Sequence, residues 1–381
     1  AFILQSFEPS LSLRWGDYVQ GFVTGLAFTD ANDDLEWEWE EYFLKFINLP
    51  GDIEVRGGRM LSRVGFHNPT HLHSWTTVDA PLPHALFLGE DGLGLEGVDL
   101  SFYLGDSQRS VLTLGFGQRP AHDHDHGHGG EDDHDHHDDS HGEEHMDEDH
   151  HDEDHHHDEH DHEHGGFEAF EAYRVNDDVF TIGFRNDLVF NDFRVLRSNL
   201  FAGLGDNEGG TRSRFAGAGV EFQWRENGLE PGGRSFRWRN EVIFFDSNAS
   251  SHDHGEDDHE EDHHDHDEHG HEEDHDHDHE DHDHDEHGEE GSGVSTWGFS
   301  SEILYEARPY FHPFARIDYV GETEELEISD WIRYTLGATF PLQENPGVYF
   351  RLQANADERG DESEQSVWAQ IGFDWGGPEV R

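Results

Sequence analysis

The chain has 381 residues and a formal charge of −65 at pH 7, and it contains no cysteine. This length suits one large domain or a few small ones, while the acidity excludes nucleic acid and favours cations as partners. The lack of cysteine excludes disulfides and thiolate metal sites.

Apolar and polar residues alternate with a period of two along most of the chain, which predicts β-strands with one apolar and one polar face. Many segments run about 9–12 residues, the length of a tilted strand that crosses a bilayer. No apolar stretch is long enough for a transmembrane helix, but a barrel of spanning strands would not show in mean hydropathy. In chain order, the clearest segments lie at 97–104, 112–117, 180–185, 216–224, 332–340, 348–355 and 367–375.

The strand count is about 14, beginning at 18–29, and short strands at 9–15 and 167–174 would raise it to about 16. Short connections alternate with long or polar ones, which is the pattern of outer-membrane barrels. We therefore predict an all-β fold, with residues 1–381 forming a single transmembrane antiparallel β-barrel. The alternative is a soluble β-sandwich or barrel with one polar face, whose strands are usually about 5–6 residues long.

Two runs, at 121–165 and 251–288, consist almost entirely of His, Asp, Glu and Gly. They hold 31 of the 36 histidines and 40 of the 88 acidic residues, but no Lys or Arg. The rest of the chain keeps 48 acidic residues against 23 basic ones, a net charge of −25. Because both runs fall among the long connections, we expect two disordered extracellular loops on the same rim of the barrel.

Imidazole and carboxylate are the usual protein ligands of zinc, so the two runs predict many weak, exchanging Zn²⁺ sites. Copper and nickel would bind such ligands too. A solvated acidic loop is the alternative, but it would not need so many histidines. The candidate ligands in the runs include His122, His124, His126, His128, His134, His136, His137, His252, His254, His275, His277, His279, His282 and His284.

The long connection at 61–92 contains apolar side chains and three prolines, so we expect it to be folded. If it bends into the lumen, its ligand-type residues would form a constriction that hands metal inward. Alternatively, the same histidines would hydrogen-bond the connection to the wall of the barrel, or lie on the surface. The residues concerned are His67, His71, His73, Asp79 and His84.

Several arginines fall on the polar faces of the expected strands and are candidates for lining the pore. We interpret them as wall charges paired with carboxylates. An anion-selective ladder is the alternative, and the acidic excess disfavours it. These candidates are Arg185, Arg237, Arg239, Arg316, Arg333 and Arg351.

No convincing catalytic signature is present, and we expect the chain not to be an enzyme. The zinc-protease pattern H-E-x-x-H occurs at 259–263 and 271–275, inside the second run. His and Glu are so dense there that chance matches are expected, and no apolar periodicity supports the helix that this site needs.

The stretch from 58 to 93 resembles a known family. Its pattern is a Gly-Arg strand, an Asn-x-x-His-x-His-x-Trp segment, Asp-x-Pro-Leu, and a Leu-Gly-x-x-Gly turn, carried here by Gly58-Arg59, Asn68, His71, His73, Trp75, Asp79, Pro81-Leu82, Leu88-Gly89 and Gly92. The opening Phe7-Glu-Pro-Ser-Leu-Ser-Leu is similar to that family's first strand. The stretch is similar to Gram-negative outer-membrane porin-like β-barrels described as zinc-associated or zinc-regulated, which are distantly similar to phosphate-selective porins. The resemblance implies a monomeric or trimeric channel linked to metal supply.

These observations predict an outer-membrane channel of a Gram-negative bacterium that captures divalent metal, zinc foremost, on its external loops. The metal would then pass to the periplasm by diffusion. A surface metal buffer without a metal-specific pore and a general porin are the alternatives. The expected partners are divalent metal ions and outer-membrane lipid, with a homo-oligomer left open. The first residues lack the basic stretch of a signal peptide, so a mature chain is expected.

Overall fold

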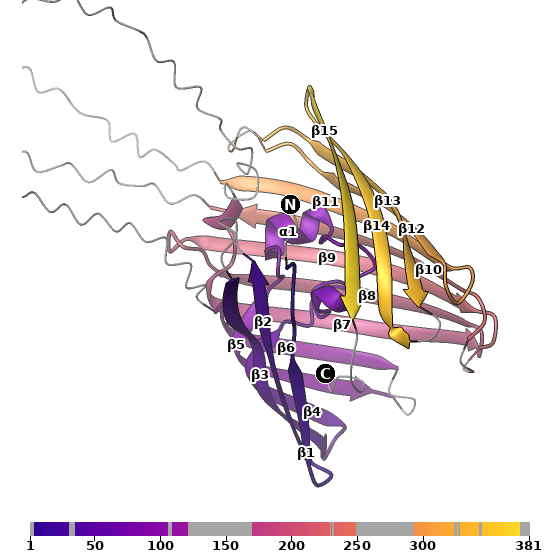
Figure 1. The fold of residues 1–381 in the computed structure, drawn as a ribbon. Coiled ribbons are helices and arrows are strands. Elements are labelled where there is room, and N and C mark those ends of the chain that lie inside the picture. Colours follow the sequence, from indigo (N-terminus) through magenta and orange to yellow (C-terminus); the bar gives the residue numbers. More distant parts are fainter. Residues whose placement is uncertain are drawn as a thin grey trace, which may run out of the picture.

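The computed structural model describes residues 4–29, 35–105, 109–120, 170–228, 230, 232–248, 293–323, 326, 328–342 and 345–373. Fifteen strands form one antiparallel sheet, in which each strand pairs with its neighbours in the sequence (Figure 1). They are β1 Ser10–Trp15, β2 Val19–Thr29, β3 Leu35–Leu49, β4 Ile53–Leu61, β5 Gly94–Leu104, β6 Ser110–Gln118, β7 Asp177–Asn191, β8 Arg194–Asp206, β9 Arg212–Arg225, β10 Ser235–Ser247, β11 Val294–Glu306, β12 His312–Val320, β13 Trp331–Leu342, β14 Asn345–Arg359 and β15 Glu362–Phe373. The prediction of an all-β barrel is confirmed, with a strand number inside the expected range.

In the barrel wall, large apolar side chains are exposed and polar side chains are buried, which is the reverse of a soluble protein. Along β13, Leu336 is 68% exposed, while the neighbouring Thr335 is buried. The same contrast recurs on other strands: large apolar side chains such as Val98, Leu200, Phe244 and Ile371 are exposed, whereas Asp99, Asn199, Glu241 and Gln353 are buried. Because a strand turns alternate side chains to opposite faces, this pattern puts apolar groups toward lipid and polar groups toward the lumen.

The strands that flank the two histidine-rich runs place both connections at one rim of the barrel. The first lies between β6 and β7 and the second between β10 and β11. Since neighbouring strands are antiparallel, every connection that follows an even-numbered strand lies at this same rim. The runs themselves, with all of their candidate ligands, lie outside the described residues.

The connection between β4 and β5, residues 62–93, is called the inner loop here, and it packs inside the barrel. It contains a 3-10 turn, Leu72–Ser74, and the helix α1, Leu82–Leu88, all of whose residues are buried. The apolar side of α1 packs with Phe170 and Phe245; the ring centroids of Phe87 and Phe245 are 5.3 Å apart. Phe170 and Tyr173 therefore pack in or against this apolar cluster, and the described residues 170–174 are not the strand considered from sequence at 167–174.

The seam of the barrel lies between β1 and β15, where the described residues show no backbone pairing. Residues 4–9 extend β1 along β2, with a bridge between Phe7 and Ala27. A side-chain hydrogen bond crosses the seam, because Gln370 of β15 donates to Gln5 Oε1 at 2.6 Å. None of the helices in the described part of the chain combines the length and apolar composition needed to cross a membrane.

Candidate functional site

The inner loop is fastened to the wall through Asp79. Its carboxylate accepts hydrogen bonds at 3.0 Å from both Arg316 of β12 and Arg333 of β13. It also accepts from Gln353 and Asn355 of β14, at 2.8 and 3.1 Å. Burial raises the pKa of Asp79, but the two arginines outweigh burial and hold the pKa below its usual value.

The other candidate pore arginines also have partners. Arg351 donates to the carbonyls of Trp75 and Thr77, at 2.8 and 3.0 Å. Arg237 and Arg239 pair with Glu302 and Glu221, at 3.1 and 2.8 Å. Arg185 differs from the rest, because it is exposed on β7 and lies 3.4 Å from Asp187. Most of these arginines therefore hold the inner loop or neutralise wall carboxylates.

His84 contacts the wall, and His67 packs against other residues of the inner loop. The His67 ring lies 4.4 Å from the Trp75 ring and 5.1 Å from the His84 ring, centroid to centroid. His84 Nε2 is hydrogen-bonded to Glu241 of β10, which also accepts the backbone N–H of Phe66 at 2.7 Å. Burial, and then the charges of His84 and nearby arginines, lower the pKa of His67 well below its usual value.

His71 and His73 face a different group of residues. His71 Nδ1 lies 2.6 Å from Glu40 Oε2 and 3.5 Å from Glu8 Oε2, and its Nε2 lies 2.7 Å from Glu41. His73 Nδ1 lies 2.7 Å from Glu8 Oε2. Burial raises the pKa of Glu8, but its interactions with His71 and His73 outweigh burial and lower the pKa to about 2. The five residues grouped by sequence are thus divided among three places.

A β-bulge explains why two adjacent carboxylates of β3 reach His71. Thr24 pairs with Glu41 and Gly25 pairs with Trp39, so Glu40 is an extra residue in the register. Bulges redirect side chains in this way. Glu8 and Glu40 were missed by sequence reasoning. The signal that could have drawn attention to Glu40 is the run Glu40-Glu41, which breaks the alternation of β3.

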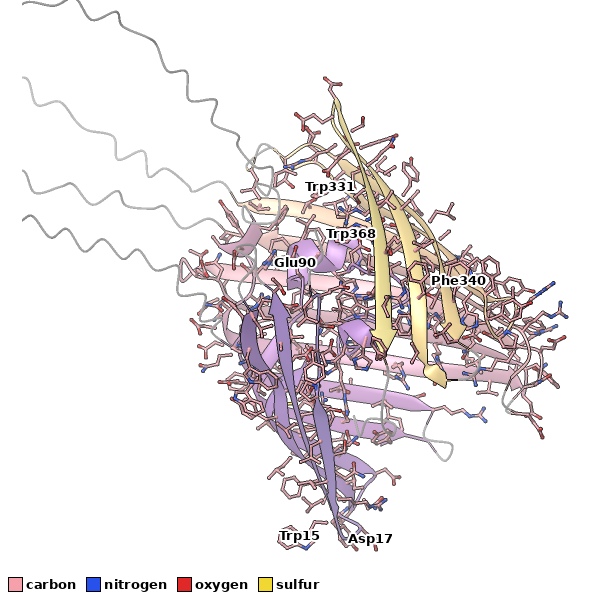
Figure 2. All side chains as sticks on the ribbon, in the orientation of Figure 1. Trp15, Asp17, Glu90, Trp331, Phe340 and Trp368 are labelled. Carbon is pink, nitrogen blue, oxygen red and sulfur yellow. The ribbon has the colours of Figure 1, made fainter. Side chains whose placement is uncertain are left out.

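A cavity of about 400 Å³ lies beside this cluster, between the inner loop, the strands β2 and β3, and the seam. Figure 2 shows Glu90 of the inner loop and Trp368 of β15, which both line it. Six carboxylates line this cavity, against one arginine, Arg333: Glu8, Glu38, Glu40, Asp79, Glu90 and Asp91. The lining of this space therefore has more acidic than basic side chains, with one of the carboxylates, Asp79, paired with Arg316 and Arg333.

No protein-family model and no curated protein matches the chain. Among solved structures it is similar to an anion-selective porin from Comamonas acidovorans, with 8% identity and a TM-score of 0.49, covering 97% of this chain and 85% of that one. It is also similar to the outer-membrane channel DcaP of Acinetobacter baumannii, with 8% identity and a TM-score of 0.49, covering 96% and 83%. A third similar structure is OpdL of Pseudomonas aeruginosa, with 9% identity and a TM-score of 0.48, covering 97% of this chain and 81% of that one.

The fold is assigned from the strand order and from the exposed apolar and buried polar faces of the wall. All-antiparallel, up-and-down strands with an outward apolar face are the architecture of outer-membrane barrels. The chain therefore has the fold of an outer-membrane β-barrel.

Proposed function

We propose that this barrel is a passive channel for divalent cations, zinc foremost. The observation that carries the proposal is the acidic lining of the cavity, which has six carboxylates, one of them, Asp79, paired with the single arginine of the lining, Arg333. Charged side chains that line a passage select the ions of opposite sign. The ions would move by diffusion down their gradient.

The two histidine-rich runs would act before the pore. They join strands at a single rim, and we propose that this rim faces outward. Their carboxylates would raise the local cation concentration within about 8–10 Å, and their imidazoles would bind zinc weakly and release it. Capture at the mouth followed by passage through an acidic lumen accounts for both features together.

Planar-bilayer recordings of the full chain test the channel. With a KCl gradient across the bilayer, we expect a reversal potential of the sign that marks cation selectivity. Anion selectivity, or no conductance, would overturn the proposal. Absence of conductance would leave the second candidate, a surface metal buffer, which the many histidines favour.

Zinc uptake tests the link between capture and passage. Cells that express the chain without residues 121–165 and 251–288 should take up zinc more slowly at limiting zinc, and at the same rate when zinc is abundant. Equal uptake at limiting zinc, with conductance intact, would leave a general porin.

A further inference from the structure

Three metal-ligating side chains from separate parts of the chain meet beside the cavity. Glu8 comes from the N-terminal segment, Glu40 from the bulge of β3, and His71 from the inner loop. One oxygen or nitrogen atom of each lies within 4.8 Å of the other two. Each of these residues also lines the cavity, so an ion there could reach them.

Several buried atoms of this cluster are not fully satisfied. Glu8 Oε1 has no hydrogen-bond partner, and Glu40 Oε2 and His71 Nδ1, which lie 2.6 Å apart, contact each other without good hydrogen-bond geometry. The side chain of His71 is 1% exposed. Because buried polar atoms are nearly always satisfied, a cluster of unsatisfied ones indicates a missing ion or water.

The residues that contact His71 and Glu8 would orient these two side chains, as the neighbours of metal ligands usually do. His71 Nε2 lies 2.7 Å from Glu41 Oε2, so an Nε2–H would donate to that carboxylate and leave the Nδ1 lone pair for a metal. A carboxylate behind a ligating histidine is the common arrangement in zinc proteins. His73, whose ring stacks on that of His71, also contacts the Glu8 carboxylate and would hold it in place.

The charge balance here differs from that of the rest of the wall. Most other buried carboxylates pair with Arg or Lys: Glu54 with Lys45 and Arg63, Asp99 with Arg56, Glu221 with Arg197 and Arg239, and Asp318 with Arg316. Glu241, which pairs with His84, is an exception. Glu8, Glu40 and Glu41 instead pair with histidines. Three carboxylates around one buried imidazole leave room for a cation as their counter-ion.

We propose that Glu8, Glu40 and His71 bind one divalent cation of the zinc class inside the barrel. This site rests on the proposed channel function and gives the passing ion a place to stop. One nitrogen and two carboxylate oxygens suit zinc, which accepts such ligands at about 2.0–2.2 Å. Water from the cavity would fill the fourth position. A magnesium or calcium site would instead be expected to use oxygen ligands throughout.

Crystals of the full chain soaked in zinc chloride test this site, with anomalous scattering at the zinc edge as the position-specific readout. Metal bound by the histidine-rich runs does not interfere, because the peak is located in space. We expect a peak bonded to His71 Nδ1 and to both carboxylates. Glu40→Gln should remove it with little change in shape, and His71→Asn should remove it too. Glu54→Gln is the matched control, since it changes a buried wall carboxylate of β4 and should leave the peak in place.

A wild-type map without a peak at this point would overturn the proposal, as would a peak that persists in both Glu40→Gln and His71→Asn. Either result would leave the channel proposal intact if potassium currents are cation-selective. An anion-selective channel that still shows the peak would sink the channel proposal and leave a buried metal site.

Zinc block of the potassium current gives a second measurement on the same protein. Glu41→Gln, which touches the metal only through His71, should raise the half-blocking zinc concentration about 10–100-fold. An unchanged half-blocking concentration would contradict the role of Glu41 as a positioning residue.

Discussion

Asp79 of the inner loop and Arg316 of β12 form an ion pair, with 3.0 Å between Oδ1 and Nη2, although 237 residues separate them in the sequence. The Arg316 side chain is fully buried, and it also binds Asp318 at 2.8 Å. Arg333 reaches the other oxygen of Asp79 at 3.0 Å. This carboxylate is therefore a central anchor that keeps the inner loop against the wall.

Removing the charge of Asp79 should loosen the inner loop. Asp79→Asn keeps the size of the side chain but removes an anionic partner of two arginines. We expect this to lower the free energy of unfolding by on the order of 3 kcal/mol. We expect a larger and noisier single-channel conductance and a lower melting temperature. Asp187→Asn is the control, because Asp187 pairs with Arg185 and Arg197 on the wall. Equal conductance in Asp79→Asn and wild type would show that the loop does not limit the pore.

The same anchor should respond to acid. The pKa of Asp79 in the folded chain lies below its unfolded value of about 3.9. The carboxylate therefore stabilises loop docking fully above about pH 4, and this contribution is lost as the pH falls through the folded pKa. The groups that face it are Arg316, Arg333, Gln353 and Asn355, of which the arginines stay charged throughout.

Conductance recorded at decreasing pH checks this expectation. It should stay constant down to about pH 4 and rise below that value in the wild type. In Asp79→Asn the conductance should already be high at neutral pH and should show no rise below about pH 4. If the variant shows the same transition, another carboxyl group is responsible for it.

Gly97 of β5 and Gly117 of β6 lie opposite each other in the register. A Cβ at Gly97 would come 2.1 Å from the carbonyl oxygen of Phe116 and 2.6 Å from the Gly117 Cα. Since these are backbone atoms, Gly97→Ala must push the two strands apart, and we expect a cost of about 1–3 kcal/mol and less assembled barrel. Gly57→Ala is the control, because its nearest neighbours would be 3.9 and 4.0 Å away. Similar yields of folded barrel for both variants would argue against close strand contact at Gly97.

The outward face of β13 provides a test of membrane insertion. Leu336 lies in the middle of this strand and Leu342 at its end, and both are exposed. Arginine near the bilayer midplane costs about 2–4 kcal/mol, against about 0–1 kcal/mol near an interface. Guanidinium unfolding from lipid vesicles should therefore show a large decrease in the free energy of unfolding for Leu336→Arg and a small decrease for Leu342→Arg. Equal losses would place this face outside the hydrocarbon.

The wall could be predicted from the sequence because its determinants are local. A strand exposes alternate residues on opposite faces, so the exposed Leu336 beside the buried Thr335 follows from the period-two pattern alone. The common rim of the two runs follows in the same way from the order of antiparallel strands. The short helix α1 was not expected, since seven residues between prolines and glycines carry little periodic signal.

The site was only partly predictable. Sequence spacing grouped His67, His71, His73, Asp79 and His84 together, because they are neighbours along the chain. The tertiary structure separates them: His84 binds Glu241, Asp79 binds Arg316, and His71 meets Glu8 and Glu40. By itself the sequence determined a strand barrel with an outward apolar face and a folded connection at 61–92, and it predicted two metal-binding runs. Only the tertiary structure decided which carboxylates face which histidines, because those partners come from distant strands and from one bulge in β3.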